Sequence, residues 1–362
     1  MRNDRILLIM ITAVLICIGI VMIYSSSSIY AWKNLHDSTY FLKRHLIYLM
    51  VGLLAMVSVM MVDYHWLQRH AKVILLTSVV FLLLVLVPGL GREVGGARRW
   101  FRFFGFGFQP SEFAKLAFIV YLSDFLSRKQ NKIRDLFHGF APAMTIMGVF
   151  TLAILLQPDL GTAIVVVVIG FTLFFLAGGK IVHLITTVAL CLPVFYALIW
   201  SSAYRRMRII SFWNPWADPQ GSGFQLIQSQ IAMGSGGIFG IGLGQSKQKL
   251  FYLPAAHTDF IFSIIGEELG LIGTLSIVAL FFVFLWQIAK IVRNAPDGFG
   301  YFLGSGILIM LAFESVINIG VATGSLPTKG LPLPFISYGG SALVVAMVSV
   351  GLLLNISRSR GL

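Results

Sequence analysis

Charged residues are scarce in this chain: only 11% of its 362 residues are Asp, Glu, Lys or Arg. A soluble domain carries about a quarter. Hydrophobic residues make up 57% of the sequence, and the mean hydropathy is +0.88. They come in blocks of about 15 to 25 residues, the length that a helix needs to cross a bilayer. The shortage of charge therefore excludes a soluble protein and predicts an all-α polytopic integral membrane protein.

Cysteine is also scarce. The two cysteines, Cys17 and Cys191, lie inside apolar blocks, so they imply neither a disulfide framework nor a metal cluster. The seven histidines show no paired spacing of the zinc-ligand type. We therefore predict no metal site and no zinc or redox enzyme, and the need for a divalent cation stays open.

Soluble segments are equally hard to find. No separate soluble domain, low-complexity linker or internal repeat is visible, so we expect a single membrane domain over residues 1–362. The net charge is +13, but no soluble basic domain carries it. Nucleic acid is therefore not a predicted partner.

Ten apolar blocks are long enough to be membrane-spanning helices. They are residues 6–25, 46–62, 72–88, 111–127, 139–156, 160–178, 181–200, 261–289, 299–322 and 341–356. The first is longer than a signal-peptide core and no clear cleavage site follows it, so we expect it to be retained. Ten spans place both termini on one side, and the positive short turns on that side predict that it is cytoplasmic. Residues 201–260 then form one large external loop between the seventh and eighth helices.

Positive residues are as common in the predicted external loops as in the inner ones, against the usual bias. Basic groups kept outside indicate a local role, such as holding an anionic substrate. Attraction to anionic lipid headgroups accounts equally well for any single one of them. They gather in two loops, with Arg92, Arg98, Arg99 and Arg102 in the first and Arg205, Arg206, Arg208, Lys247 and Lys249 in the second.

The segment 95–118 is rich in aromatic residues, as is typical of an interfacial or re-entrant segment. The QPS sequence at 109–111 predicts a helix start. Glu112 and Lys115 lie three residues apart on one helix face, where they can pair. A structural ion pair is the simpler interpretation. In lipid, however, both charges must face protein or a wet cavity, so a functional role is an equal alternative.

Three other polar features lie within or beside apolar blocks. Asp159 in QPDLGTA is expected to cap a helix rather than to act in catalysis. Glu314, deep in the ninth block, is expected to make an interhelical hydrogen bond as the protonated acid. Residues 325–341 contain too much proline and glycine for a regular helix. They should form a surface or cavity-lining loop that brings Lys329 to the outer face.

The stretch YLPAAHTDFIFSIIGEELG, residues 252–270, places polar groups against an apolar run. These groups are His257, Thr258, Asp259, Glu267 and Glu268. The first three stand at the membrane edge of the eighth block. The two glutamates lie about two to three turns deeper, where helix packing or a cavity lining is the first interpretation.

Together, these motifs resemble the SEDS family of bacterial cell-envelope proteins. The resemblance rests on GGARRW, QPSEFAKL, QPDLGTA, NPWADPQGSGFQLIQSQIAMGSGGIFGIGLGQS, LPAAHTDFIFSIIGEELG and LPTKGLPLPFISYGGSA, in that order over nearly the whole chain. Lys329 in LPTKG and the TDFIFSIIGEELG stretch look more like the division-type (FtsW-like) branch and its sporulation relatives than the elongation-type (RodA-like) branch. Ala255 stands where the division branch commonly has an acid, so no role is carried over to that position.

The resemblance implies a ten-helix fold in the bacterial cytoplasmic membrane, with both termini cytoplasmic. It implies a peptidoglycan glycosyltransferase that polymerises lipid II, an undecaprenyl-pyrophosphate disaccharide–peptide, on the outer face in cell division or sporulation. The family's essential acid matches Asp259, and the family pair that matches Glu112 and Lys115 lines the same central cavity.

The same resemblance implies partners. Family members work with a single-span class B penicillin-binding transpeptidase and with other divisome proteins. We expect the transpeptidase to dock on the eighth and ninth helices, where Phe281, Phe282 and Phe284 would supply apolar contact.

The implied chemistry needs few groups. The donor leaves as a polyprenyl pyrophosphate, so a carboxylate that deprotonates the acceptor hydroxyl and cations that stabilise the developing negative charge are sufficient. Because the donor linkage is α and the product linkage β, a single inverting displacement requires one base, which we assign to Asp259. The predicted substrate-binding residues are Arg98, Arg99, Glu112, Lys115, His257, Thr258 and Lys329.

Two other classes of function compete with the transferase. A lipid II flippase would also hold charges in a cavity, but it should show polar groups on both membrane faces, whereas here the densest polar motifs lie on one. A non-catalytic scaffold for a transpeptidase would leave the basic external loops unexplained. An elongation-type polymerase is the alternative within the family.

Overall fold

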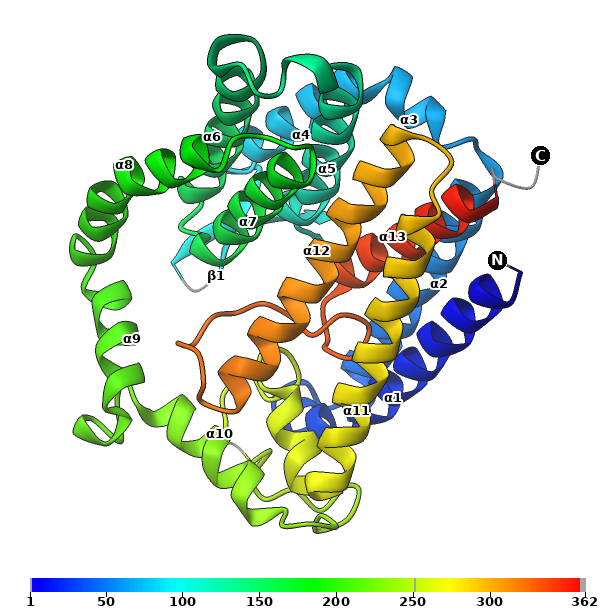
Figure 1. Ribbon diagram of the computed structural model, residues 1–362. Helices are drawn as coiled ribbons and strands as arrows, with labels where there is room; N and C mark the ends of the chain where they lie inside the picture. The colour runs from blue at the N-terminus through cyan, green and yellow to red at the C-terminus, as the bar shows by residue number, and fades with distance from the viewer. Residues whose placement is uncertain (1, 95, 104, 251, 359–362) are drawn as a thin grey trace.

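The computed structural model describes residues 2–94, 96–103, 105–250 and 252–358. Each of the ten apolar blocks coincides with a helix. These helices are α1 (Arg2–Leu35), α2 (Tyr40–Met61), α4 (Ala71–Leu84), α5 (Pro110–Arg128), α6 (Ala141–Leu155), α7 (Leu160–Leu176), α8 (Ile181–Trp200), α11 (Ile261–Arg293), α12 (Gly298–Ala322) and α13 (Gly340–Arg358). In Figure 1 the helix over residues 181–200 extends away from the bundle that the other helices form. The predicted helical membrane fold is confirmed.

Six helices of the described chain are long and apolar enough, taken alone, to cross a membrane. They are α1, α2, α6 with the turn before it, α11, α12 and α13, whereas α4, α7 and the first part of α8 are apolar but shorter. The chain is therefore a multi-pass membrane protein, and the count of ten spans stays a prediction. The start of α1 and the end of α13 lie on the same side of the bundle in Figure 1, as an even number of spans requires.

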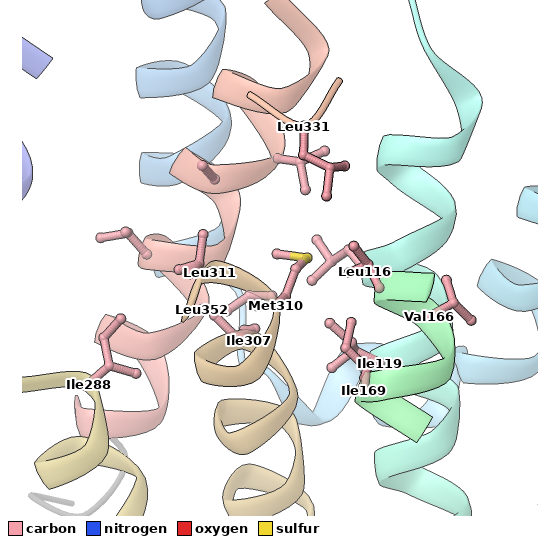
Figure 2. Packing of buried hydrophobic residues seen from close by; sticks show 14 of the residues in the cluster. Leu116, Ile119, Val166, Ile169, Ile288, Ile307, Met310, Leu311, Leu331 and Leu352 are labelled. Atoms are coloured by element: carbon pink, nitrogen blue, oxygen red, sulfur yellow. The ribbon is translucent and has the colours of Figure 1, made fainter. Parts of the chain in front are cut away.

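Helix α12 lies at the centre of the bundle. It packs against α5 and α7 on one side and against α11 on the other, and Figure 2 shows Met310 of α12 reaching toward Leu116 of α5. A Cβ on Gly306 would lie 2.4 Å from the side chain of Ile119, so the glycine allows α12 to approach α5 closely. This contact determines where the few charged residues of these two helices meet.

The aromatic part of the segment predicted to be interfacial or re-entrant forms a small antiparallel sheet, and its position relative to the membrane stays a prediction. Its strands are β1 (Gly91–Val94), β2 (Ala97–Phe103) and β3 (Phe106–Phe108), in the order β1-β2-β3. Along β2, Ala97 and Phe101 are buried while Arg102 is exposed. The Phe101 ring packs against Phe81 of α4, 6.4 Å between centroids. Alternate residues of a strand face opposite sides, so one face of β2 is buried and the other is exposed. Phe101, on the buried face, anchors the sheet on the bundle.

The region predicted to form the large external loop contains helices of its own. These are α9 (Ala203–Trp213), the 3₁₀ turn Pro215–Ala217 and α10 (Phe224–Ser235). The glycine-rich segment after α10 then lies against the start of α11, where the amide of Ile241 donates to the carbonyl of Glu267 (3.0 Å). A Cβ on Gly240 would lie 2.2 Å from the carbonyl oxygen of Glu268, so this approach requires glycine.

Helix α11 is kinked at Gly270, and we predict that Gly270→Ala destabilises the protein. Gly270 has φ +67 and ψ −163, and a Cβ there would lie 2.3 Å from the amide nitrogen of Gly240. Strain in such a conformation costs about 1–3 kcal/mol, and the overlap adds to it. The midpoint of thermal unfolding in detergent should fall clearly. Gly148→Ala is the control, because Gly148 is exposed on α6 with no atom within 4 Å of the added Cβ; equal midpoints for both variants would contradict the prediction.

The predicted Phe-rich partner surface on α11 is wrong for two of its three residues. Phe281 and Phe284 are buried, and only Phe282, with 67% of its surface exposed, faces outward. Residues three apart share a helix face, and this face turns inward, where Phe284 packs against Phe335 at 5.6 Å between centroids. A partner could reach Phe282 but neither of the other two rings.

Candidate active site

Asp259 lies in the turn just before α11 and is half-buried. Asn318 of α12 holds this turn, since its side-chain amide donates to the carbonyls of Asp259 (3.0 Å) and Leu331 (2.8 Å). A Cβ on Gly330 would lie 3.0 Å from the Asp259 carboxylate. The loop after α12 therefore passes directly beside the carboxylate of Asp259.

One cation, Arg208, lies near enough to this carboxylate to affect its ionisation. Burial raises the pKa of Asp259 to about 6, and the positive charge of Arg208 opposes the shift. Arg208, on α9, donates to the carbonyl of Thr328 (3.1 Å). Burial lowers the pKa of Lys329 to about 8, a shift that Asp159 opposes and Arg208 increases. Arg208 thus acts on both groups: on Asp259, and on Lys329 in the loop that passes beside Asp259.

His257 and Thr258 hold the same turn through their backbones. The amide of Tyr338 donates to the carbonyl of His257 (2.9 Å), and the hydroxyl of Ser337 donates to that of Thr258 (2.6 Å). The His257 ring lies 4.5 Å from the ring of Phe41, and burial lowers the pKa of His257 to about 4. His257 is therefore neutral at pH 7 and packs as an aromatic group, while its substrate-binding role stays a prediction.

Glu112 and Lys115 pair as predicted, and a third residue joins them. The Lys115 ammonium lies 2.9 Å from the Glu112 carboxylate, and it also pairs with Glu314 of α12. All three side chains are buried. The interhelical bond predicted for Glu314 is confirmed, but it is made to a cation on α5. One ammonium thus contacts the carboxyl groups of residues on two helices.

Arg98 and Arg99, both predicted to bind substrate, contact the protein itself. Arg98 pairs with Glu93 at 3.3 Å on the neighbouring strand. Arg99 donates to the carbonyls of Gln157 and Pro158 (2.8 and 2.6 Å) and so ties the sheet to the loop before α7. Their role toward a substrate stays a prediction.

Asp159 caps α7, as predicted: its carboxylate accepts from the amide of Thr162 (3.2 Å) and from its hydroxyl (2.9 Å).

Within the described ranges, no group of three or more His, Cys, Asp or Glu side chains is placed to hold a metal ion.

A comparison with protein-family models matches residues 5–361 to the Cell cycle protein family of FtsW, RodA and SpoVE. The chain belongs to this family. A probable peptidoglycan glycosyltransferase FtsW from Geobacter metallireducens is 48% identical over 356 residues, 98% of this chain and 95% of the relative. Stage V sporulation protein E of Bacillus subtilis is 47% identical over 356 residues, 98% of this chain and 97% of the relative.

Solved structures similar to this FtsW–RodA–SpoVE family member cover its whole fold. One, described as "Structural coordination of polymerization and crosslinking by a peptidoglycan synthase complex", has a TM-score of 0.80 and 30% identity, over 98% of this chain and 97% of that chain. The crystal structure of the rod shape determining protein RodA of Thermus thermophilus has a TM-score of 0.72 and 28% identity, over 98% and 96%. The fold of this chain is therefore that of the family.

Glu267 and Glu268 of this family member have the packing role that the sequence predicts. Both are buried. The Glu267 carboxylate accepts from the amide of Lys247 (2.9 Å) and from the hydroxyl of Ser246. Glu268 pairs with the buried ammonium of Lys249 at 2.9 Å. The two carboxylates therefore fasten the glycine-rich segment onto α11.

The sequence motifs of the family did not single out Arg208 or Asn318. Arg208 carried a weak signal, as one of the positive charges predicted to lie outside the membrane against the usual bias. Asn318 carried another, as a buried amide within an otherwise apolar helix. Neither signal says that these residues reach the turn of Asp259, because that depends on how distant segments pack.

Proposed function

We propose that the chain is a peptidoglycan glycosyltransferase that polymerises lipid II on the outer face of the bacterial cytoplasmic membrane. One observation carries the proposal: the Asp259 carboxylate stands at the edge of an apolar bundle, beside the loop of Lys329 and within the influence of Arg208. Its relatives named as probable peptidoglycan glycosyltransferases support the same activity.

In this mechanism Asp259 acts as the general base. It takes the proton from a hydroxyl of the acceptor sugar, and that oxygen attacks the anomeric carbon of the donor. The bond from this carbon to the polyprenyl pyrophosphate breaks with inversion, from α to β. Lys329 and Arg208 stabilise the negative charge that develops on the pyrophosphate. Both substrates reach the site because their lipid tails hold them at the membrane edge.

We further propose division or sporulation as the process served. The FtsW and stage V sporulation relatives are 48% and 47% identical to the chain, whereas the RodA structure is 28% identical. An elongation role is the alternative. The proposed partner is a single-span class B penicillin-binding transpeptidase, with other divisome proteins. On α11 it would contact Phe282 and Trp286, exposed rings that stack 6.3 Å apart.

The test is polymer formation from purified lipid II by the purified protein in detergent, with and without a candidate transpeptidase. Glycan strands of several disaccharides are expected with the partner present. A flippase would bind lipid II but make no glycan under these conditions, where translocation has no meaning. Absence of glycan with every co-purifying transpeptidase would contradict the proposal.

The rate of polymerisation should depend on pH in a bell shape. Asp259 must be ionised to accept a proton, so kcat/KM should fall as the pH falls through about 6. Lys329 loses its charge as the pH rises through about 8, so the rate should fall again there. Initial rates across this range would measure both limbs. Lys329→Arg keeps its charge at high pH, and it should move only the alkaline limb upward; an acid limb near pH 4 would contradict the assignment of Asp259.

A further inference from the structure

A cavity of about 520 Å³ opens beside the sheet, within the range of small-molecule sites (~300–1,000 Å³). It lies between the start of α2, the strands and the start of α13. Its lining includes Arg44, Arg92, Trp100, Arg102, Thr258 and Tyr338. Asp259, Arg208 and Lys329 are not among the described residues that line it. We call it the arginine pocket.

The charge of the arginine pocket has one sign. Three arginines line it, and its described lining contains no carboxylate. The nearest acidic residue on the sheet, Glu93, is paired with Arg98, and neither of the two lines the pocket. Guanidinium groups bind phosphate oxygens through two parallel hydrogen bonds. The pocket therefore suits a ligand with more than one negative charge.

One arginine is fixed and two are available. The Arg44 guanidinium donates to the hydroxyl of Tyr40 and to the carbonyl of Gly105, and it lies 5.4 Å from the centre of the Phe106 ring. Arg92 and Arg102 are exposed, and no ion pair or side-chain hydrogen bond to another described residue holds either guanidinium. These two side chains can reorient onto a ligand while Arg44 keeps its place.

The strands bring the two available arginines onto the face that carries an aromatic ring. Arg92 on β1 is paired directly with Trp100 on β2, and Arg102 lies two residues after Trp100, so the three side chains share one face of the sheet. A Cβ on Gly107 would lie 3.2 Å from the Trp100 ring, so the ring lies close to this glycine. Flat aromatic rings stack on the apolar faces of sugar rings.

We propose that the arginine pocket binds the sugar and pyrophosphate of a lipid-linked saccharide, separately from the site of Asp259 and Arg208. The inference rests on the proposed function, because polymerisation requires two lipid-linked saccharides at once. Thr258 lines the pocket and its neighbour in the chain is Asp259. One substrate therefore occupies each side of this dipeptide, with Arg92 and Arg102 holding the pyrophosphate and Trp100 the sugar.

The test counts the lipids bound per chain by native mass spectrometry of the full-length protein in detergent. The probes are lipid II, undecaprenyl pyrophosphate without sugar, and phosphatidylglycerol. We expect the wild type to bind two lipid II molecules. The double variant Arg92→Ala, Arg102→Ala should bind the second molecule at least about tenfold more weakly, because it loses hydrogen bonds to charged groups. Trp100→Ala should weaken the second lipid II but not the sugar-free pyrophosphate.

The matched control is Lys43→Ala, which removes a charge beside Arg44 without altering the pocket, since Lys43 is exposed and pairs with Asp37 at 2.9 Å. It should bind two lipid II molecules like the wild type. The proposal would be overturned if the double arginine variant bound two lipid II molecules as well as the wild type does. It would also be overturned if that variant lost phosphatidylglycerol binding as much as lipid II binding, which would indicate a general headgroup site. If two lipid II molecules bound but no glycan formed, the proposed function would be refuted, whereas the proposed binding site would be supported.

Discussion

Asp259→Asn is expected to lower the rate of glycan polymerisation at least ~10²-fold, the magnitude of a lost general base and equivalent to roughly 3 kcal/mol of barrier. The amide has the size of the carboxylate but cannot accept the proton of the acceptor hydroxyl. The contacts that hold this turn, from Asn318 and Ser337, are made to backbone carbonyls. Folding should therefore survive the change. The initial rate on lipid II, together with the unfolding midpoint, measures both expectations.

Asp218→Asn is the matched control for this variant. Asp218 lies in the same segment between α8 and α11, and its carboxylate accepts from the backbone amides of Gly221 (3.0 Å) and Ser222 (2.8 Å). Its replacement should leave the rate within a few fold of the wild type. A rate loss as large as that of Asp259→Asn would show that any lost carboxylate in this region disables the protein.

Lys115→Met is expected to destabilise the protein by about 3–5 kcal/mol, the usual cost of removing one partner from a buried ion pair. Methionine fills most of the space of the lysine stem but leaves the carboxylates of Glu112 and Glu314 buried without their cation. Because these residues join α5 to α12, the loss should loosen the centre of the bundle. The midpoint of thermal unfolding in detergent is the measurement.

The same cluster offers a more specific comparison. Glu314→Gln should cost less than Lys115→Met, because the pair of Lys115 with Glu112 remains. Combining Lys115→Met with Glu112→Gln and Glu314→Gln should recover part of the stability, since no buried charge is then left unpaired. If the triple variant were less stable than Lys115→Met alone, charge pairing would not be what this cluster contributes.

Features fixed by local pattern were predictable from the sequence. In a bilayer only a helix or closed barrel satisfies every backbone group, so long apolar blocks had to become helices. The pairing of Glu112 with Lys115 and the capping by Asp159 follow from spacings of three residues. For the same reason Asp259, just before α11, could be placed at the end of a helix.

Features that join distant segments were not predictable in this way. Glu314 meets Lys115 across 199 positions of sequence, and only the close packing of α12 on α5 brings them together. The sheet was missed because its strands are short and their aromatic residues also fit a membrane interface. The inward orientation of Phe281 and Phe284 depended on which face of α11 meets the bundle. A single sequence does not specify these packing choices.

The central claim is that this chain polymerises lipid II with Asp259 as the base. Its most direct test compares the wild type and Asp259→Asn, each purified with its transpeptidase, on purified lipid II in detergent at pH 7. We expect glycan strands from the wild type and, from the variant, a rate no higher than about 1% of the wild-type rate. Polymerisation by Asp259→Asn at close to the wild-type rate would contradict the assignment of Asp259 as the base.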